Sequence, residues 1–215
     1  MIDMHASAST KIDEEGRGGM EVDAEQVIRA NTYSLLASLL VAPPSEDSLA
    51  RLKHIDVPQG NGQSAMAAAW HALRLAGEHA TVEALDDEYH DLFIGLGRGE
   101  LVPYGSWYMS GFLMDQPLMV LRQDLMALGF ERQDDVPEPE DHVAALCETM
   151  SLIINSGEEI PSDTQHKFFA DHLGPWMGKF FSDLQEAKSA RFYRAVGQLG
   201  EQFMEIEQQY LGMLT

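Results

Sequence analysis

Residues 95–108 read Gly-Leu-Gly-Arg-Gly-Glu-Leu-Val-Pro-Tyr-Gly-Ser-Trp-Tyr and hold four glycines, one proline and three aromatic residues. Glycine and proline both interrupt helices, so this stretch predicts a sharp turn. The sequence on either side carries apolar residues at helical spacing, which indicates that the turn divides an otherwise helical chain. A second unusual stretch, Glu-Pro-Glu-Asp-His, follows at residues 138–142. We expect the two stretches to meet across one intervening helix.

The 215 residues show no strand alternation and no hairpin dipeptide, so the predicted fold class is all-α, a single globular domain of roughly eight to ten helices. The domain is expected to span residues 23–215 after a disordered N-terminal tail at residues 1–22, with a charged hinge at residues 131–138 between two halves. Further helices are predicted over residues 65–79 and 106–113. Capping residues mark the other helix starts: Asp23 with Gln26, Ser45, Thr81, Asp115, and Ser162 with Gln165.

The second stretch has two readings, and the residues alone leave both open. Pro139 followed by acidic residues is typical of a first helical turn, because proline fits there and the helix dipole favours negative charge, so we expect a helix from Pro139. His142 is not explained by capping, and a neighbouring aspartate and histidine are also typical of acid-base pairs. No serine or cysteine nucleophile motif accompanies the pair.

The chain is strongly acidic, with 35 acidic against 14 basic residues and a net charge of -21. Phosphate would be repelled at nearly every approach, so a nucleic-acid partner is not expected. A cationic partner is favoured instead. The alternative is that the acidity only confers solubility on a helical scaffold.

Cys147 is the single cysteine, so no internal disulfide can form, and a reducing cytoplasmic location is predicted. Because it lies beside Leu146 on a predicted helix, we expect a buried, inert thiol. No apolar run reaches the length needed to cross a bilayer, and residues 1–22 lack the apolar block of a signal peptide. We therefore expect a protein that is not membrane-embedded.

Two Asp-x-x-His pairs, Asp87 with His90 and Asp163 with His166, place a carboxylate and an imidazole on one helical face. A metal-dependent helical-bundle enzyme is therefore the alternative function. Both pairs lie in polar runs, and the other helices carry no isolated glutamate inside an apolar stripe. We accordingly expect no metal site and no catalytic residue.

Aromatic residues and carboxylates come together around the first stretch. Tyr104, Trp107 and Tyr108 follow the helix whose polar face carries Asp87 and Asp91. Carboxylates pair with guanidinium groups, aromatic rings stack on them, and an apolar groove takes apolar side chains. The combination predicts binding of an extended peptide that contains arginines and an apolar segment. The other reading is that these aromatic residues are simply core.

With these motifs the sequence resembles the TorD/DmsD/NarJ family of redox-enzyme maturation chaperones over about residues 25–210. Two motifs in the right order and spacing carry the resemblance: the proline-aromatic-Gly-Ser turn of residues 103–106 and the Glu-Pro-x-Asp-His motif of residues 138–142. The matching segments are Tyr89-His90-Asp91-Leu92-Phe93-Ile94-Gly95, Val102-Pro103-Tyr104-Gly105-Ser106-Trp107-Tyr108, Leu121-Arg122, Leu128-Gly129, Glu138-Pro139-Glu140-Asp141-His142, His172-Leu173-Gly174-Pro175-Trp176 and Phe192-Tyr193-Arg194-Ala195.

The resemblance implies a cytoplasmic, all-helical chaperone that binds the twin-arginine signal peptide of an apo-molybdoenzyme and holds its catalytic subunit from export until the molybdenum cofactor is inserted. The family's peptide-binding positions fall on Tyr104, Ser106, Glu138, Asp141 and His142. Family members have been linked to guanine nucleotides and to the molybdenum cofactor, whereas the glycines of residues 95–99 are a weak nucleotide motif, so we expect no bound cofactor. The complete candidate peptide-binding set is Asp87, Asp91, Tyr104, Ser106, Trp107, Tyr108, Glu138, Pro139, Asp141 and His142.

Overall fold

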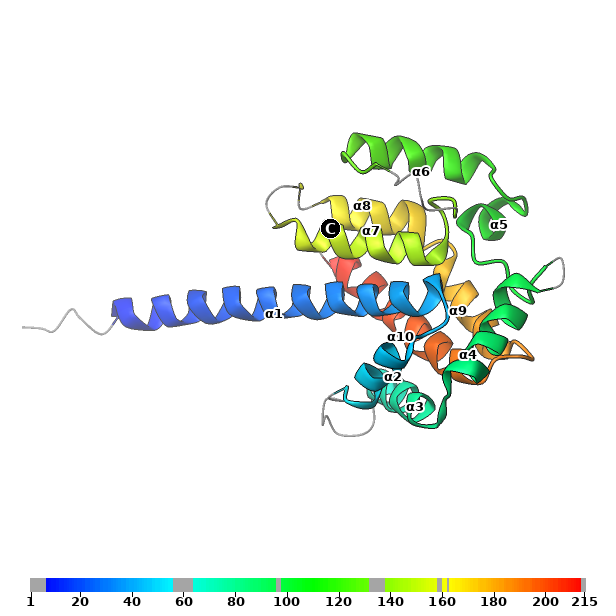
Figure 1. Ribbon diagram of the computed structural model, residues 1–215. Coiled ribbons are helices and arrows are strands. Elements are labelled where there is room, and N and C mark those ends of the chain that lie inside the picture. The colour runs from blue at the N-terminus through cyan, green and yellow to red at the C-terminus, as the bar shows by residue number, and fades with distance from the viewer. Residues whose placement is uncertain are drawn as a thin grey trace, which may run out of the picture.

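The computed structural model describes residues 7–55, 64–95, 98–131, 138–157, 160–161 and 163–213, with side chains from residue 24 onward. Helices make up all of the regular structure in these ranges, and one isolated bridge between Tyr104 and His142 is the only β-type pairing (Figure 1). The all-α prediction is confirmed. Within the described residues, no helix is both long and apolar enough to span a membrane.

Twelve elements follow one another in the described ranges of the chain. They are α1 (Ser7–Val41), α2 (Glu46–Lys53), α3 (Ala65–His79), α4 (Val82–Tyr89), the π-helix η1 (His90–Ile94), α5 (Gly105–Ser110), α6 (Gln116–Ala127), α7 (Val143–Asn155), α8 (Thr164–Phe168), the π-helix η3 (Phe169–Leu173), α9 (Met177–Glu186) and α10 (Phe192–Met213).

Several helix ends lie where the sequence predicts them. The hydroxyl groups of Ser45 and Thr81 accept hydrogen bonds from backbone amides in the first turns of α2 and α4. Asp115 precedes α6, which holds Pro117 in its first turn, and Gly129 follows it with a φ of 79°, a left-handed conformation suited to glycine. Local chemistry therefore fixes these boundaries.

The start of α1 differs from the prediction, because the helix passes through Asp23 and begins at Ser7. No proline lies between Ser7 and Val41 to interrupt the helix. The capping pattern at Asp23 therefore lies inside a continuous helix and does not mark its start. Residues 7–22, expected as a disordered tail, are helical in backbone, and their side chains lie outside the described set. The predicted cap Ser162 and residues 132–137 of the predicted hinge also lie outside the described residues, so both stay predictions.

The core is built around α7 and α10. α1 packs along α7, while α10 packs against α9 and α3 (Figure 1). Aromatic residues fill the space beside α9 and α10, including the fully buried Phe180, Phe181 and Tyr193. Cys147 is buried in α7, and burial raises the pKa of its thiol well above the usual value, as the prediction of an inert thiol requires.

A buried ion pair ties the first helix to the last. Arg29 of α1 donates from Nε to Oε1 of Glu207 at 2.6 Å and from Nη2 to Oε2 at 2.8 Å. The Tyr33 hydroxyl donates to the same carboxylate at 3.0 Å, and the Arg29 guanidinium lies over the Tyr210 ring. Because Glu207 is fully buried, its charge depends on these partners.

The end of α4 is tied to the start of α10 by Glu88, a buried residue. Its carboxylate accepts hydrogen bonds from the backbone amides of Arg191, Phe192 and Tyr193 at 2.7, 3.2 and 2.8 Å. These amides open the first turn of α10 and have no partner within the helix. Glu88 therefore caps α10 from a distant segment and fixes α4, which continues into η1.

Replacing Glu207 with glutamine is expected to lower the free energy of unfolding by about 3–5 kcal/mol, because the Arg29 guanidinium stays buried without a counter-charge. Urea denaturation of the purified chain measures the change. Glu205→Gln on the exposed face of the same helix is the matched control and should stay within about 0.5 kcal/mol of the wild type. Equal effects of the two substitutions on the free energy of unfolding would show that the buried ion pair does not stabilise the fold more than an exposed side chain does.

Candidate functional site

The two unusual stretches meet in the folded chain. The amide of Gly105 donates to the carbonyl oxygen of Asp141, and the amide of Val143 donates to that of Pro103, both at 2.9 Å. Tyr104 and His142 pair in an antiparallel bridge between these two bonds. The predicted contact is confirmed, and it brings the start of α5 against the start of α7.

Close approaches of the backbone account for the glycines of the first stretch. A Cβ on Gly99 would lie 2.5 Å from the Phe93 carbonyl carbon, and one on Gly105 would lie 3.2 Å from Nε1 of Trp176. Gly95 has a φ of 62°, the left-handed region that glycine adopts readily. The described glycines therefore serve the turn between η1 and α5, as the turn reading predicts.

The segment before α7 is a turn and not the first turn of a helix, so the predicted helix start at Pro139 is wrong. The helix begins at Val143, and His142 is its N-cap with an extended ψ of 138°. Nδ1 of His142 accepts a hydrogen bond from the Ala144 amide at 3.2 Å. The reason is tertiary, because the backbone of Asp141 and Val143 is held by the partner stretch and cannot also close helical hydrogen bonds.

Asp141 is a buried carboxylate with one oxygen satisfied. The residue is only 3% exposed, and its Oδ2 accepts a hydrogen bond from the Ser106 amide at 2.8 Å. Oδ1 is buried and has no hydrogen-bond partner among the described residues. An unpaired buried carboxylate oxygen is costly, so this atom is poised to accept a donor.

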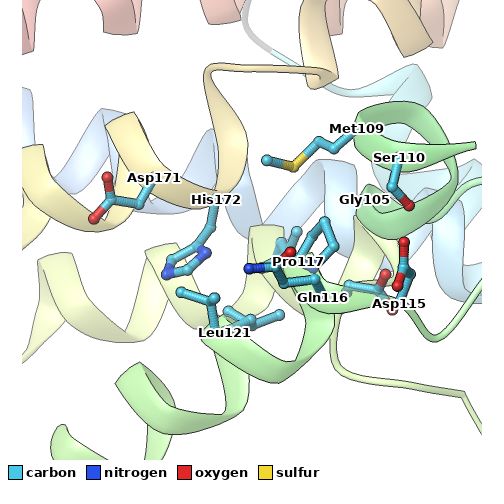
Figure 2. Close-up of a pocket in the computed structure, with 12 residues that line it drawn as sticks. Gly105, Met109, Ser110, Asp115, Gln116, Pro117, Leu121, Asp171 and His172 are labelled. Carbon is cyan, nitrogen blue, oxygen red and sulfur yellow. The ribbon is translucent and has the colours of Figure 1, made fainter.

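The cavity that Asp141 lines has a volume of about 510 Å³. It lies between α5, α6, α7 and η3, and Figure 2 shows Met109 and Pro117 between His172 on one side and Asp115 on the other. The described residues of its lining include carboxylates and apolar side chains but no lysine or arginine. The lining residues are Gly105, Met109, Ser110, Asp115, Gln116, Pro117, Val120, Leu121, Asp141, Leu146, Asp171 and His172.

Tyr104, Glu138 and His142 form a cluster beside this carboxylate. The Tyr104 hydroxyl donates to Oε2 of Glu138, and the Tyr104 ring meets the His142 imidazole edge to face at 5.1 Å. Burial, and then the Glu138 carboxylate, raise the pKa of Tyr104. Burial lowers the pKa of His142 from its usual 6.5 to about 4, against the pull of Glu138 and Asp141. His142 is therefore neutral near pH 7 with its proton on Nε2, because Nδ1 is an acceptor.

The other predicted residues of the first stretch have partners inside the chain. Ser106 is fully buried, and its hydroxyl accepts a hydrogen bond from the Met114 amide at 3.2 Å. The Arg98 guanidinium covers the Trp107 ring at 4.4 Å from its centroid. The Tyr108 hydroxyl donates to Asp183 at 3.2 Å. The structure thus gives Ser106 and Tyr108 clear packing roles beside the site.

Asp87 and Asp91 are both exposed, on α4 and η1 respectively, and within the described part of the chain neither is hydrogen-bonded to Glu138, Asp141 or His142. Their role in peptide binding stays a prediction.

The Asp-x-x-His alternative gains no support from the described residues, in which no group of three or more His, Cys, Asp or Glu side chains could hold a metal ion. His90 turns to Asp86, whose carbonyl oxygen lies 2.8 Å from Nδ1, and not to Asp87. Asp163 is exposed, and His166 is half-buried.

An exposed apolar surface beside the cavity was not predicted. The link between α5 and α6 exposes Phe112 and Met114 by 71% each, and it continues into Met109 and Val120 of the cavity lining. Its signal in the sequence is the apolar run between Gly111 and the cap Asp115. The helix predicted over residues 106–113 instead ends at Ser110, where Gly111 adopts a left-handed φ of 83°, so no helix buries this run. The cavity therefore combines acidic groups with an apolar rim.

A second large hollow, of about 690 Å³, lies between α1, α2 and α3. Among the described residues that line it, Arg51 is the charged one and none carries a carboxylate. Its chemistry does not match the cationic ligand that the acidic sequence favours.

Comparison with known proteins gives consistent results. The sequence profile of a family described as nitrate reductase delta subunit matches residues 59–182. The chain is 26% identical over 204 residues to the chaperone protein TorD of Vibrio cholerae serotype O1 (strain ATCC 39541), covering 86% of this chain and 93% of that one. It is 24% identical over 210 residues to the chaperone protein TorD of Shewanella pealeana, covering 89% and 93%.

Among solved structures, the fold is similar to that of a protein described as a redox enzyme maturation protein from Archaeoglobus fulgidus. The TM-score is 0.53 at 22% sequence identity, and the match covers 83% of this chain and 94% of that chain. At this identity the likeness concerns the fold.

The buried His142 predicts a pH dependence of stability. Because its pKa is lower in the folded chain than the usual 6.5, the unfolded chain binds the proton first as pH falls, and this contribution to stability is complete above pH 6.5 and is lost toward pH 4. The loss amounts to about 3 kcal/mol. Asparagine at this position keeps the cap without titrating, so urea denaturation should show wild type losing more stability than His142→Asn over this range. Parallel pH profiles for the two proteins would contradict the assignment.

Proposed function

The chain belongs to the nitrate reductase delta subunit family, and on that premise we propose that it is a non-enzymatic chaperone of molybdoenzyme maturation. It binds the twin-arginine signal peptide of an apo-molybdoenzyme in the cytoplasm and holds the catalytic subunit for cofactor insertion before export. The relatives in Vibrio cholerae and Shewanella pealeana are named chaperone proteins, which supports the chaperone role. The proposal needs no cofactor bound to the chain.

The observation that carries the proposal is the unpartnered Oδ1 of Asp141 in the wall of the 510 Å³ cavity. A guanidinium group supplies N–H donors in a planar fork and the positive charge that balances a buried carboxylate. A hydrogen bond to a charged group is worth about 1.5–3 kcal/mol. Binding an arginine here would therefore give Oδ1 the hydrogen-bond donor that it lacks among the described residues.

The rest of the cavity suits the remainder of such a peptide. Asp115 and Asp171 add negative charge to the lining, and Met109 and Val120 give it an apolar wall. The exposed Phe112 extends that wall beyond the cavity. Methionine side chains adapt to different apolar partners, so this rim fits a hydrophobic segment that follows the arginines.

The neighbouring residues support the carboxylate. Ser106 fixes Asp141 through its amide, and His142 presents a neutral imidazole next to it. Glu138 is held by Tyr104 within the same cluster. The net charge of -21 attracts a basic peptide from a distance, with the exposed Asp87 among its sources.

Removing the charge of Asp141 tests the proposal. Asp141→Asn keeps an oxygen for the Ser106 amide but turns the free oxygen position into an amide, so affinity for a labelled Arg-Arg signal peptide should fall about tenfold or more. Fluorescence anisotropy measures the affinity, with a Gln-Gln peptide as the ligand control. Asp47→Asn, an exposed carboxylate on α2, is the matched control for net charge and should bind as the wild type does.

Equal affinity of the wild type for the Arg-Arg and Gln-Gln peptides would overturn the proposed function. Unchanged Arg-Arg binding by Asp141→Asn would remove this cavity as the binding site.

A further inference from the structure

Three hollows follow α6 from its beginning to its end. The first is the 510 Å³ cavity beside Pro117 and Leu121, the second, of about 260 Å³, lies beside Arg122 and Leu125, and the third, of about 140 Å³, lies beside Leu128. Figure 1 shows α6 at the outer edge of the molecule, above α7 and α8 in that view. The space between α6 and the body of the protein is therefore incompletely filled along its whole length.

Few contacts hold α6 in place. Leu118 and Leu121 are its buried side chains, whereas Met119, Val120 and Met126 are exposed. Charged contacts to η3, to α8 and to the turn before α7 add to this, and the one to α8 places Asp124 Oδ1 3.9 Å from Lys167 Nζ.

One of these contacts joins Asp124 to the buried imidazole of His172, with Oδ2 and Nε2 2.9 Å apart. Another joins Arg122 to Glu140, where Nε and Nη2 both donate to Oε2 at 2.9 Å. The Arg122 contact pins α6 to the turn that also carries Asp141.

The Arg122 contact has the chemistry expected of an arginine ligand. Among the described residues that line the second hollow, Arg122 is the one base, and the acids are Glu131, Glu138, Glu140 and Glu148. The side chain of Arg122 is 48% exposed and that of Glu140 is 17% exposed. A guanidinium group from within the chain therefore rests on a carboxylate next to the candidate site.

A single hollow does not suit both arginines of a twin-arginine peptide. Successive side chains of an extended peptide point in opposite directions, so only one of two neighbouring arginines can enter the first hollow. The unpartnered, buried Oδ1 of Asp141 marks that position independently of the glutamates. Glu140, the preceding residue, lines the second hollow instead.

We propose that the two arginines of the peptide are read by two adjacent carboxylates, the first by Asp141 and the second by Glu140, where it displaces Arg122. Arg122 thus holds the second position closed in the peptide-free protein. The exchange replaces one guanidinium with another, and because the Arg122 side chain is 48% exposed, its ion pair with Glu140 is worth only about 0.2–1 kcal/mol, so a ligand arginine can displace it. The displacement also removes one of the contacts that pin α6 over the hollows. This inference rests on the proposed function.

The test is the affinity of four proteins for the Arg-Arg peptide: wild type, Arg122→Gln, Glu140→Gln and the double variant. Removing the internal competitor should tighten binding by Arg122→Gln about twofold to fivefold. In the Glu140→Gln background the same substitution should have no effect, because the contested carboxylate is gone. Arg51→Gln is the matched control, since Arg51 is an exposed arginine paired with Asp47 on α2, and it should leave affinity unchanged.

The outcomes separate the two proposals. If wild type binds the Arg-Arg peptide better than the Gln-Gln peptide but Arg122→Gln binds no more tightly, the displacement is wrong and the proposed function stands. A gain from Arg122→Gln that persists without Glu140, or that Arg51→Gln matches, would reflect loss of positive charge alone and would also overturn the displacement. Failure of wild type to distinguish the two peptides would overturn the proposed function itself.

Discussion

The backbone pairing of Tyr104 with His142 holds the candidate site together. Two hydrogen bonds, from Gly105 to Asp141 and from Val143 to Pro103, join a turn between helices to the residues that precede α7. This pairing sets His142 as the cap of α7 and places the Asp141 carboxylate against the Ser106 amide. The position of the Asp141 carboxylate in the cavity wall, with Glu140 just before it in the chain, therefore depends on this contact.

Two kinds of buried carboxylate differ in how fully their oxygens are hydrogen-bonded. Glu207 and Glu88 have their oxygens satisfied by Arg29 and Tyr33 or by the amides that open α10, and each links elements distant in sequence. Asp141 is buried as deeply but keeps one oxygen without a partner among the described residues. A fully paired carboxylate stabilises the fold, whereas a half-paired one in a cavity wall is a place for a ligand. This contrast separates the site from the structural ion pairs.

Local sequence predicted much of the fold, because capping hydroxyls, prolines and glycines act on their own neighbours. The helix of residues 65–79 and the cap Thr81 are examples. The start of α7 could not be predicted in this way, since Pro139 and the acidic residues fit a helix until Gly105 and Pro103 take up the backbone of the segment. The contact of Arg122 with Glu140 was equally hidden, because it depends on how α6 lies over the body and not on spacing along one helix.

The sequence predicted only part of the candidate site, because some of its contacts depend on tertiary packing. Motif spacing brought the two stretches together, but it could not show that Ser106 would be buried or that Arg98 would cover Trp107. A crystal structure of the full chain with an Arg-Arg signal peptide tests the central claim most directly. We expect one guanidinium to lie at hydrogen-bonding distance, about 2.7–3.2 Å, from Oδ1 of Asp141. A peptide bound elsewhere, for example between α1, α2 and α3, with that oxygen still unpartnered, would contradict the claim.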